Sequence, residues 1–220
     1  MNDDALTATR EALHAVAEHV LAADLHRSNG HIGLRATPGG FGTPMVDTPG
    51  GARRARVEGT ELVLELGDDV KRMPLTTLGE AAAFLDVPLG APEGLYAIAT
   101  AKDADAPLAI DPAAAARVHD LFRLTDEALR WFAAEVAPDD PPVAQLWPEH
   151  FDLALSFDEV NYGGSPGDGG HPEPYLYVGP WELTQGPYWN EPFGASVSAS
   201  EVEAVDDAVA FFRTGRQAAN

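Results

Sequence analysis

The sequence contains no cysteine among its 220 residues. Disulfide bonds, thiolate nucleophiles and metal sites with sulfur ligands are therefore excluded. Without cysteine pairing, the sequence carries no information about the redox state of the compartment in which the protein works.

Long apolar runs are absent too. No segment approaches the roughly 18 consecutive apolar residues of a membrane-spanning helix. The sequence begins with MNDDALTATREALHAVAEHV, which is acidic and amphipathic, whereas a secretory signal peptide has a basic region followed by an apolar one. We therefore expect a cytoplasmic protein that does not span a membrane.

Basic residues are few: Lys and Arg total 14 against 35 Asp and Glu, which gives a net charge of −21. Residues 111–220 hold 19 acidic and 5 basic residues, whereas residues 1–110 hold 16 and 9. A surface of this charge repels phosphate groups, so we expect neither nucleic acid nor an anionic membrane as a partner. Only two of the basic residues are lysines, which with abundant Ala, Gly and Pro indicates a GC-rich genome of the actinobacterial type.

Between Trp131 and Phe212 there is no Lys or Arg at all, although fifteen Asp and Glu occur there. The counter-charge must come from water, a metal ion, a ligand, or arginines elsewhere in the fold. The one basic cluster is Arg53, Arg54 and Arg56. It is either a solvated strand face or a partner for the acidic second half or for an anionic ligand.

Helical spacing of apolar residues and capping residues predict helices near both ends and in the middle of the chain. The first begins at Asp3 or Asp4 and ends at Asn29-Gly30. The longest begins at Asp111-Pro112 and ends before the proline-rich segment 138–142. Two shorter helices follow capping-box patterns: residues 77–87, and residues 198–215 with a stop near Gly215.

Strands are predicted between these helices. The sequence TPGG occurs at 37–40 and at 48–51, and each copy is typical of a turn in a meander. The strongest hairpin signal joins two strands across Gly59-Thr60. The expected strands of the first half are residues 31–36, 41–47, 53–58, 61–66, 70–75 and 95–100.

Strict alternation of apolar and polar residues predicts a strand over 151–158, and Tyr175 to Trp181 predicts another. The connection from Gly163 to Pro174 contains five glycines and three prolines, so we expect a shaped loop there. The whole pattern favours one compact α+β domain, residues 1–220, with a weak boundary at 138–142. Its largely antiparallel sheet comprises the meander and the 151–181 strands, and an N-terminal, a long central and a C-terminal helix pack on it.

Aromatic residues concentrate in the same region, since ten of the eighteen lie between positions 147 and 193. Rings beside unpaired carboxylates are suited to binding a neutral polar molecule, such as a sugar, or a cation. The alternative is that these rings belong to the core and turns of a small sheet. The candidate ligand-binding residues are Trp147, His150, Asp152, Asp158, Tyr162, His171 and Trp181.

A divalent metal is the second possibility at this stretch. His150 and Asp152 have the spacing that places two ligands on one strand face, and His171 could add a third. The strong metal signatures, such as HExxH and the EF-hand loop, do not occur, and no other cofactor is indicated.

Three segments of the second half follow one another before a final helix: DPAAAARVHDLFRLTDEALRWF, LWPEHFDLALSF and PEPYLYVGPWE. In this order, and in the short motifs FDLA and PEPYLY, residues 110–215 resemble a family of bacterial, actinobacterial-type proteins catalogued as a domain of unknown function. Residues before 110 resemble it more loosely. Because no activity is established for that family, the resemblance assigns no functional residue.

Three functional hypotheses follow from the sequence. The first is a cytoplasmic protein that binds a small polar or cationic ligand in an aromatic and carboxylate cleft. The second is a metal-assisted hydrolase or isomerase that uses His150, Asp152 and His171. The third is a non-catalytic module whose acidic face contacts a basic protein partner.

Overall fold

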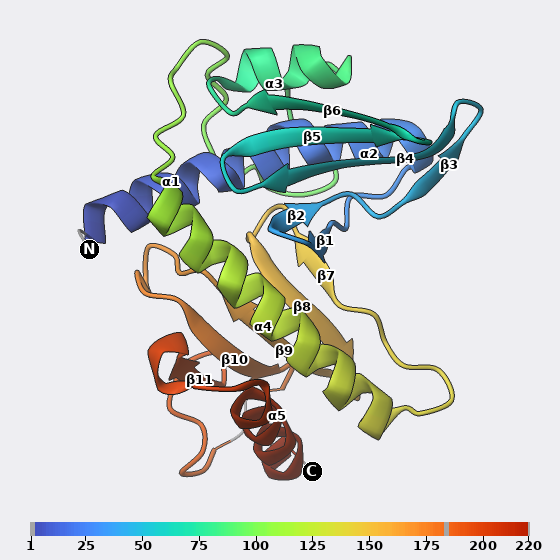
Figure 1. Ribbon diagram of the computed structural model, residues 1–220. Coiled ribbons are helices and arrows are strands. Elements are labelled where there is room, and N and C mark those ends of the chain that lie inside the picture. The colour runs from blue at the N-terminus through green and yellow to red at the C-terminus, as the bar shows by residue number, and fades with distance from the viewer. Residues whose placement is uncertain (1–2, 183–184, 220) are drawn as a thin grey trace. The chain divides into compact units, whose positions relative to one another are not determined.

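The computed structural model describes residues 3–182 and 185–219 (Figure 1). The chain divides into two compact units, Met1–Asp120 with Leu146–Phe151, and Leu121–Gln145 with Asp152–Asn220. Each unit contains antiparallel sheet and helix, so the predicted α+β class with three principal helices is confirmed. In the described residues, no helix is long and apolar enough to cross a membrane. That the chain forms one domain stays a prediction.

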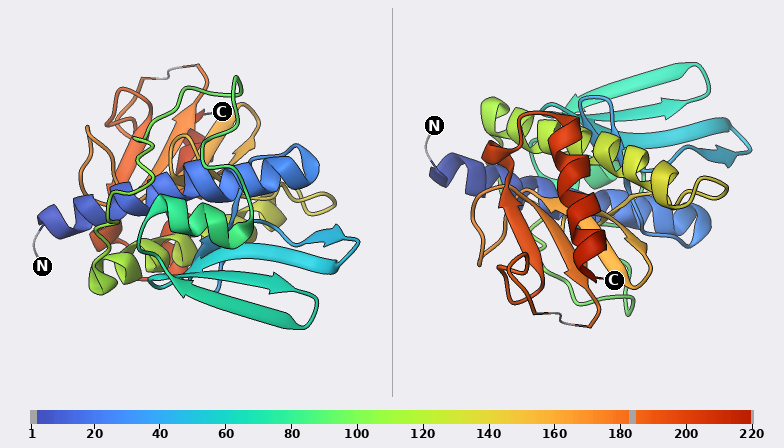
Figure 2. Two further views of the ribbon diagram at one scale, coloured as in Figure 1. Left: turned by 90° about the horizontal axis from the view of Figure 1, so that it is seen from above. Right: turned by 90° about the horizontal axis from the view of Figure 1, so that it is seen from below.

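Unit 1 begins with a continuous helical rod, which confirms the predicted N-terminal helix. It consists of α1 (Asp3–Val16), the π-helical turn η1 (Ala17–Leu21) and α2 (Ala22–Asn29). Gly30 ends the rod with a φ of 79°, and its N–H donates to the carbonyl of His26 at 2.8 Å. Helix α3 (Leu78–Leu85), capped by Thr77 as predicted, contacts α1 and η1 (Figure 2).

The sheet of unit 1 has the strand order β1-β2-β4-β5-β6, and β3 pairs separately with β4. The hairpin across Gly59-Thr60 is confirmed, because Glu58 pairs with Glu61. The strands predicted at 31–36 and 41–47 are wrong in extent. The chain there forms three strands of three residues each, with the first TPGG turn after the first strand, residues 43–45 after the second and the second TPGG turn after the third. The strands are β1 (Arg35–Thr37), β2 (Gly40–Gly42), β3 (Val46–Thr48), β4 (Gly51–Glu58), β5 (Glu61–Leu66) and β6 (Asp69–Pro74).

The predicted strand at 95–100 is wrong. No strand forms there, because the backbone N–H groups of Ala99 and Thr100 donate to the side-chain carboxylate of Glu18 rather than to a neighbouring strand. Both distances are 2.9 Å.

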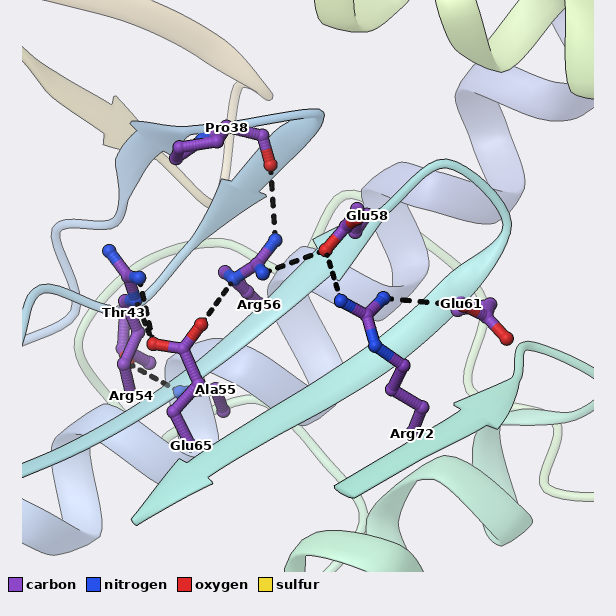
Figure 3. Close-up of polar contacts among 9 residues, drawn as sticks. All are labelled: Pro38, Thr43, Arg54, Ala55, Arg56, Glu58, Glu61, Glu65 and Arg72. Atoms are coloured by element: carbon purple, nitrogen blue, oxygen red, sulfur yellow. Dashed lines mark hydrogen bonds and ion pairs between the residues drawn. The ribbon is translucent and has the colours of Figure 1, made fainter. Parts of the chain in front are cut away.

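The arginine cluster pairs with carboxylates of its own unit. Arg53 bonds Asp24 of α2 at 2.6 Å. On the other face of β4, Arg54 and Arg56 share the two oxygens of Glu65 on β5, and the series of ion pairs continues to β6 (Figure 3). Val63, which pairs in register with Arg56 and Arg72, is fully buried among these side chains. The cluster is therefore neither a bare solvated face nor the counter-charge of the acidic second half.

Helix α4 (Pro112–Val136) begins in unit 1 and continues in unit 2. Its predicted cap is confirmed, because Asp111 Oδ1 accepts from the N–H groups of Ala113 and Ala114 at 3.0 and 2.9 Å. The short strand β7 (Gln145–Trp147) likewise lies at the division between the units.

Unit 2 contains β8 (Asp152–Phe157), β9 (Val160–Ser165), β10 (Tyr175–Pro180) and β11 (Ala195–Ser198), with the neighbours in the order β11-β10-β9-β8. One face of this sheet packs against the second half of α4 and against α5 (Val205–Ala219), which lies along it in Figure 2. Tyr162 of β9 is fully buried on this face, with its ring 4.6 Å from Phe132 and 6.0 Å from Phe212. These three rings form the centre of the unit 2 core.

Strand β9 corrects the predicted loop from 163 to 174, because its last three residues are Gly163, Gly164 and Ser165. Glycine is needed at the first two positions for space. A Cβ at 163 would lie 2.7 Å from Cζ of Tyr177, and a Cβ at 164 would lie 2.4 Å from Oγ1 of Thr125. The glycines that suggest a loop in the sequence are thus the residues that let a central strand fit between its neighbours.

The C-terminal helix also differs from its prediction. Ser198 caps only a 3-10 turn, Ala199–Glu201, and α5 starts later, at Val205. It continues past Gly215, which is buried where a Cβ would lie 2.7 Å from the Tyr188 hydroxyl and from Val178. This glycine allows close packing and does not end the helix.

Candidate functional site

The second face of the unit 2 sheet carries polar and aromatic side chains. Residues that pair across neighbouring strands point to the same face, and Tyr177 pairs with Gly163 and Ser196. Tyr175 pairs with Ser165 in the same way. Asp152, at the start of β8, reaches this face, because it accepts a hydrogen bond from the Tyr177 hydroxyl.

The bond between Tyr177 and Asp152 depends on Gly163. The tyrosine ring lies over this glycine and reaches across β9 from β10 to β8. Burial, and then the nearby Asp152 carboxylate, raise the pKa of Tyr177 well above its ordinary value. The phenol therefore stays protonated and donates, while Asp152 accepts.

Asp168 organises the loop that follows β9. Its Oδ1 accepts from the N–H groups of Gly170 and His171 at 2.6 and 2.8 Å, and its own N–H donates to the carbonyl of His171 at 2.7 Å. Its Oδ2 accepts from the Tyr175 hydroxyl at 3.1 Å. Burial acts to raise the pKa of Asp168, but the hydrogen bonds from the N–H groups of His171 and Gly170 and from the Tyr175 hydroxyl, together with the nearby His171 ring, outweigh it, so the pKa is lowered and the carboxylate is ionised at neutral pH.

A third carboxylate, Glu191, faces His171. Its Oε1 lies 3.2 Å from Nε2 of His171 and accepts from the Ser196 hydroxyl at 2.9 Å. Asn190, next to it, bonds both backbone groups of Ser196, at 3.1 and 2.9 Å. These bonds attach the segment before β11 to β11 itself.

Phe193 lies among the three polar rings of this face. Its ring centroid is 5.6 Å from His171, 6.3 Å from Tyr175 and 6.4 Å from Tyr177. Each of these three rings bonds or ion-pairs with a different carboxylate. We call the resulting set the ring-carboxylate cluster: Asp152, Asp168, His171, Tyr175, Tyr177, Glu191 and Phe193.

Two of the seven predicted ligand-binding residues, Asp152 and His171, belong to this cluster. Three others lie elsewhere in unit 2. Tyr162 is in the core, and Trp181 is 64% exposed with its Nε1 donating to Asn161 at 3.3 Å. Asp158 lies in the tight turn between β8 and β9, with a φ of 50°, and pairs with Arg216 at 3.3 Å.

The remaining two, Trp147 and His150, belong to unit 1. Trp147 is half-buried, His150 is exposed, and the His150 N–H donates to the Trp147 carbonyl at 3.2 Å. Across residues 3–182 and 185–219, no group of three or more His, Asp or Glu side chains could hold a metal ion. The predicted set of His150, Asp152 and His171 is thus not such a group, and the structure gives the metal-assisted reaction no support.

Several residues of the cluster did not follow from the sequence prediction. The alternation of Tyr175 and Tyr177 already indicates that both rings share a face, and this signal identifies them. Glu191 and Phe193 carry no such signal, because they lie in an irregular segment that only the pairing of β10 with β11 brings to the site.

No family model, no curated protein and no solved structure matches the chain. The resemblance of residues 110–215 to a bacterial family stays a prediction.

Proposed function

We propose that this protein is a cytoplasmic binding protein whose ring-carboxylate cluster holds a small polar molecule with a cationic group. The observation that supports this proposal is the pairing of three carboxylates with three adjacent rings on one sheet face. Such a surface offers negative charge and ring faces together, and both attract cations.

The charge on these carboxylates is the first part of the argument. Tyr177 and Tyr175 donate neutral O–H groups to Asp152 and Asp168. A neutral donor satisfies a carboxylate oxygen but does not cancel its negative charge. A cationic ligand would supply the charge that the stretch without Lys or Arg lacks.

The rigidity of the cluster is the second part. Tyr175 and Tyr177 stand on the paired strand β10, and the Asp168 turn and the Asn190 bonds hold the two segments that carry His171 and Phe193. A site that is already ordered loses little conformational entropy when it binds a ligand.

The experiment that tests the proposal is isothermal titration calorimetry with tetramethylammonium chloride, ethylamine hydrochloride and glucose. We expect both cations to bind and glucose to give no heat above dilution. Asp152→Asn keeps an acceptor for Tyr177 but removes the charge, so it should weaken cation binding about tenfold. Asp139→Asn, an exposed change in the same unit, is the matched control and should leave binding unchanged.

Two results would contradict the proposal. One is the absence of heat with both cations, and the other is equal binding to Asp152→Asn and to the unaltered protein. If glucose alone binds, the ligand of the cluster is a neutral polar molecule and not a cation.

A further inference from the structure

Strand β6 is the edge strand of the unit 1 sheet, next to β5 (Figure 1). The N–H of Leu75, directly after β6, donates to the carbonyl of Thr60 at 2.9 Å. Backbone hydrogen bonds of an antiparallel pair recur at every second residue, so the odd-numbered residues of β6 also bond to β5. The backbone N–H and C=O groups of Val70 and Arg72 therefore point away from the sheet.

The outer side of β6 is open to solvent. Residues 68–72 are all exposed, and the apolar side chain of Val70 is among them, at 57%. An exposed strand edge of this kind can pair with a strand of another chain. Pro74, at the end of β6, has no N–H to donate, so it limits any added pairing to the residues before it.

The charges along this edge reverse in sign about Val70. Residues 68–72 read DDVKR, so two acidic residues precede the valine and two basic residues follow it. In an antiparallel pair of two such strands centred on Val70, Asp69 lies opposite Lys71, and Asp68 lies opposite Arg72. Opposite charges at directly opposed positions stabilise a pair of strands, whereas like charges destabilise it.

Backbone geometry and charge select the same register. When two copies of β6 pair about Val70, the outward N–H and C=O groups of one valine meet those of the other. The neighbouring registers, centred on Asp69 or on Lys71, place two like charges directly opposite each other. Charged residues often block a strand edge against other chains, but this order of charges favours a second copy of the same strand.

The two inner charges contribute most to this complementarity. Arg72 already pairs with Glu58 and Glu61 of its own chain, at 3.0 and 3.4 Å (Figure 3). Among residues 3–182 and 185–219, by contrast, no ion pair joins Asp69 or Lys71 to another side chain. Both side chains therefore remain available to a partner strand.

We propose that the protein forms a two-fold symmetric dimer in which β6 of one copy pairs antiparallel with β6 of a second copy, centred on Val70. The unit 1 sheets of the two copies become one continuous sheet. The two valine side chains contact each other at the centre, and an Asp69–Lys71 pair lies on each side of them. Two-fold dimers of this self-complementary kind are the commonest form of homo-oligomer.

The test is sedimentation equilibrium of the full-length protein from about 1 to about 500 µM, where we expect a reversible monomer–dimer equilibrium. Asp69→Lys places a lysine opposite Lys71, and Lys71→Asp places an aspartate opposite Asp69. Each variant alone should dimerise at least about tenfold more weakly. Lys102→Asp, the same change of charge at an exposed position of unit 1, is the matched control and should dimerise as the unaltered protein does.

A mixture of the two variants separates charge pairing from damage to the fold. In the mixed dimer, two lysines of one chain face two aspartates of the other, so the mixture should dimerise about as tightly as the unaltered protein. A mixture that stays monomeric would overturn the proposal. So would an unaltered protein that is monomeric at every concentration, or a dimer that neither variant weakens.

Hydrogen exchange gives a second measurement that needs no variant. The amide of Val70 points away from β5, so its exchange should slow as the protein concentration rises and the dimer forms. In Asp69→Lys the same amide should exchange at a rate that changes little with concentration. Exchange of the Val70 amide in the unaltered protein that does not depend on concentration would contradict the proposed interface.

Discussion

The carboxylate of Glu18 accepts hydrogen bonds from both the backbone N–H and the hydroxyl of Thr100, 82 residues further along the chain. With the bond from Ala99, three donors of residues 99–100 depend on one side chain. A buried carboxylate in this position joins an irregular segment to a helix, and the same arrangement explains why residues 95–100 form no strand.

Replacement of Glu18 by alanine should destabilise unit 1 strongly. The three donors would lose their acceptor inside the protein, and each lost bond to a charged group is worth about 1.5–3 kcal/mol before relaxation. We expect a loss of roughly 3 kcal/mol or more in the free energy of unfolding, measured by urea denaturation. Glu11→Ala, at an exposed position of α1, should change it by less than about 0.5 kcal/mol. Equal stability of the two variants would show that the hydrogen bonds to Glu18 contribute nothing to the free energy of unfolding.

His119 should make stability depend on pH. Its side chain is 7% exposed, and burial lowers its pKa to about 4, below the 6.5 of the unfolded chain. Between pH 6.5 and about 4 the His119 ring is protonated in the unfolded chain but not in the folded protein. The contribution of His119 to the free energy of unfolding is therefore fully present above pH 6.5 and is lost as the pH falls to about 4. The loss amounts to roughly 3 kcal/mol at 1.36 kcal/mol per pKa unit.

The measurement is denaturation at several pH values for the unaltered protein and for His119→Phe. Burial also lowers the pKa of His14, so both proteins retain some dependence on pH. The difference between their slopes belongs to His119. Parallel curves for the unaltered protein and for His119→Phe would refute the prediction.

Tyr162 should behave as a core residue. Its hydroxyl is buried without a hydrogen-bond partner among the described residues, and its ring packs on Phe132 and Phe212. Tyr162→Phe should therefore be neutral or stabilise by up to about 1 kcal/mol, whereas Tyr162→Ala should cost about 3–5 kcal/mol. Tetramethylammonium affinity measured by calorimetry should be the same for Tyr162→Phe, and a tenfold loss would place this residue in the binding site.

Gly215 provides a test in which propensity and packing oppose each other. Alanine is favoured over glycine in a helix by about 1 kcal/mol. At position 215, however, the added Cβ would lie 2.7 Å from the Tyr188 hydroxyl and from Cγ2 of Val178. We expect Gly215→Ala to destabilise by about 1–3 kcal/mol in thermal unfolding. Thr214→Ala, exposed on the same helix, is the control, and stabilisation by both changes would contradict the packing argument.

Much of the fold follows from local signals. The cap at Asp111, the left-handed Gly30 and the Gly59-Thr60 hairpin occur as predicted, because each depends on residues close together in sequence. Two of the errors occur at glycines. Gly163 and Gly215 suggest a loop and a helix end, yet both are there because a neighbouring element approaches closely.

The candidate site shows the same division. Alternation within each strand indicates which face of its strand Asp152 occupies, and that Tyr175 and Tyr177 share a face of theirs. No local pattern relates these two strands to Glu191 or Phe193. The seven predicted residues are neighbours in sequence, and the structure distributes them between two units. Glu18 and Thr100 show the converse, since the fold bonds two residues that lie far apart in the sequence.

By itself, the sequence determined the α+β class, most helix boundaries, the main hairpins and the excess of negative charge, because these depend on composition and on residues within a few positions of one another. Only the tertiary structure decided which carboxylates meet which partners. It pairs Arg53, Arg54 and Arg56 with carboxylates of unit 1, bonds Thr100 to Glu18, and groups the rings around Phe193. A hydrogen bond or ion pair forms only where two groups lie close together in space. Sequence patterns indicate only the local periodicity of the backbone, so they do not show which distant residues meet.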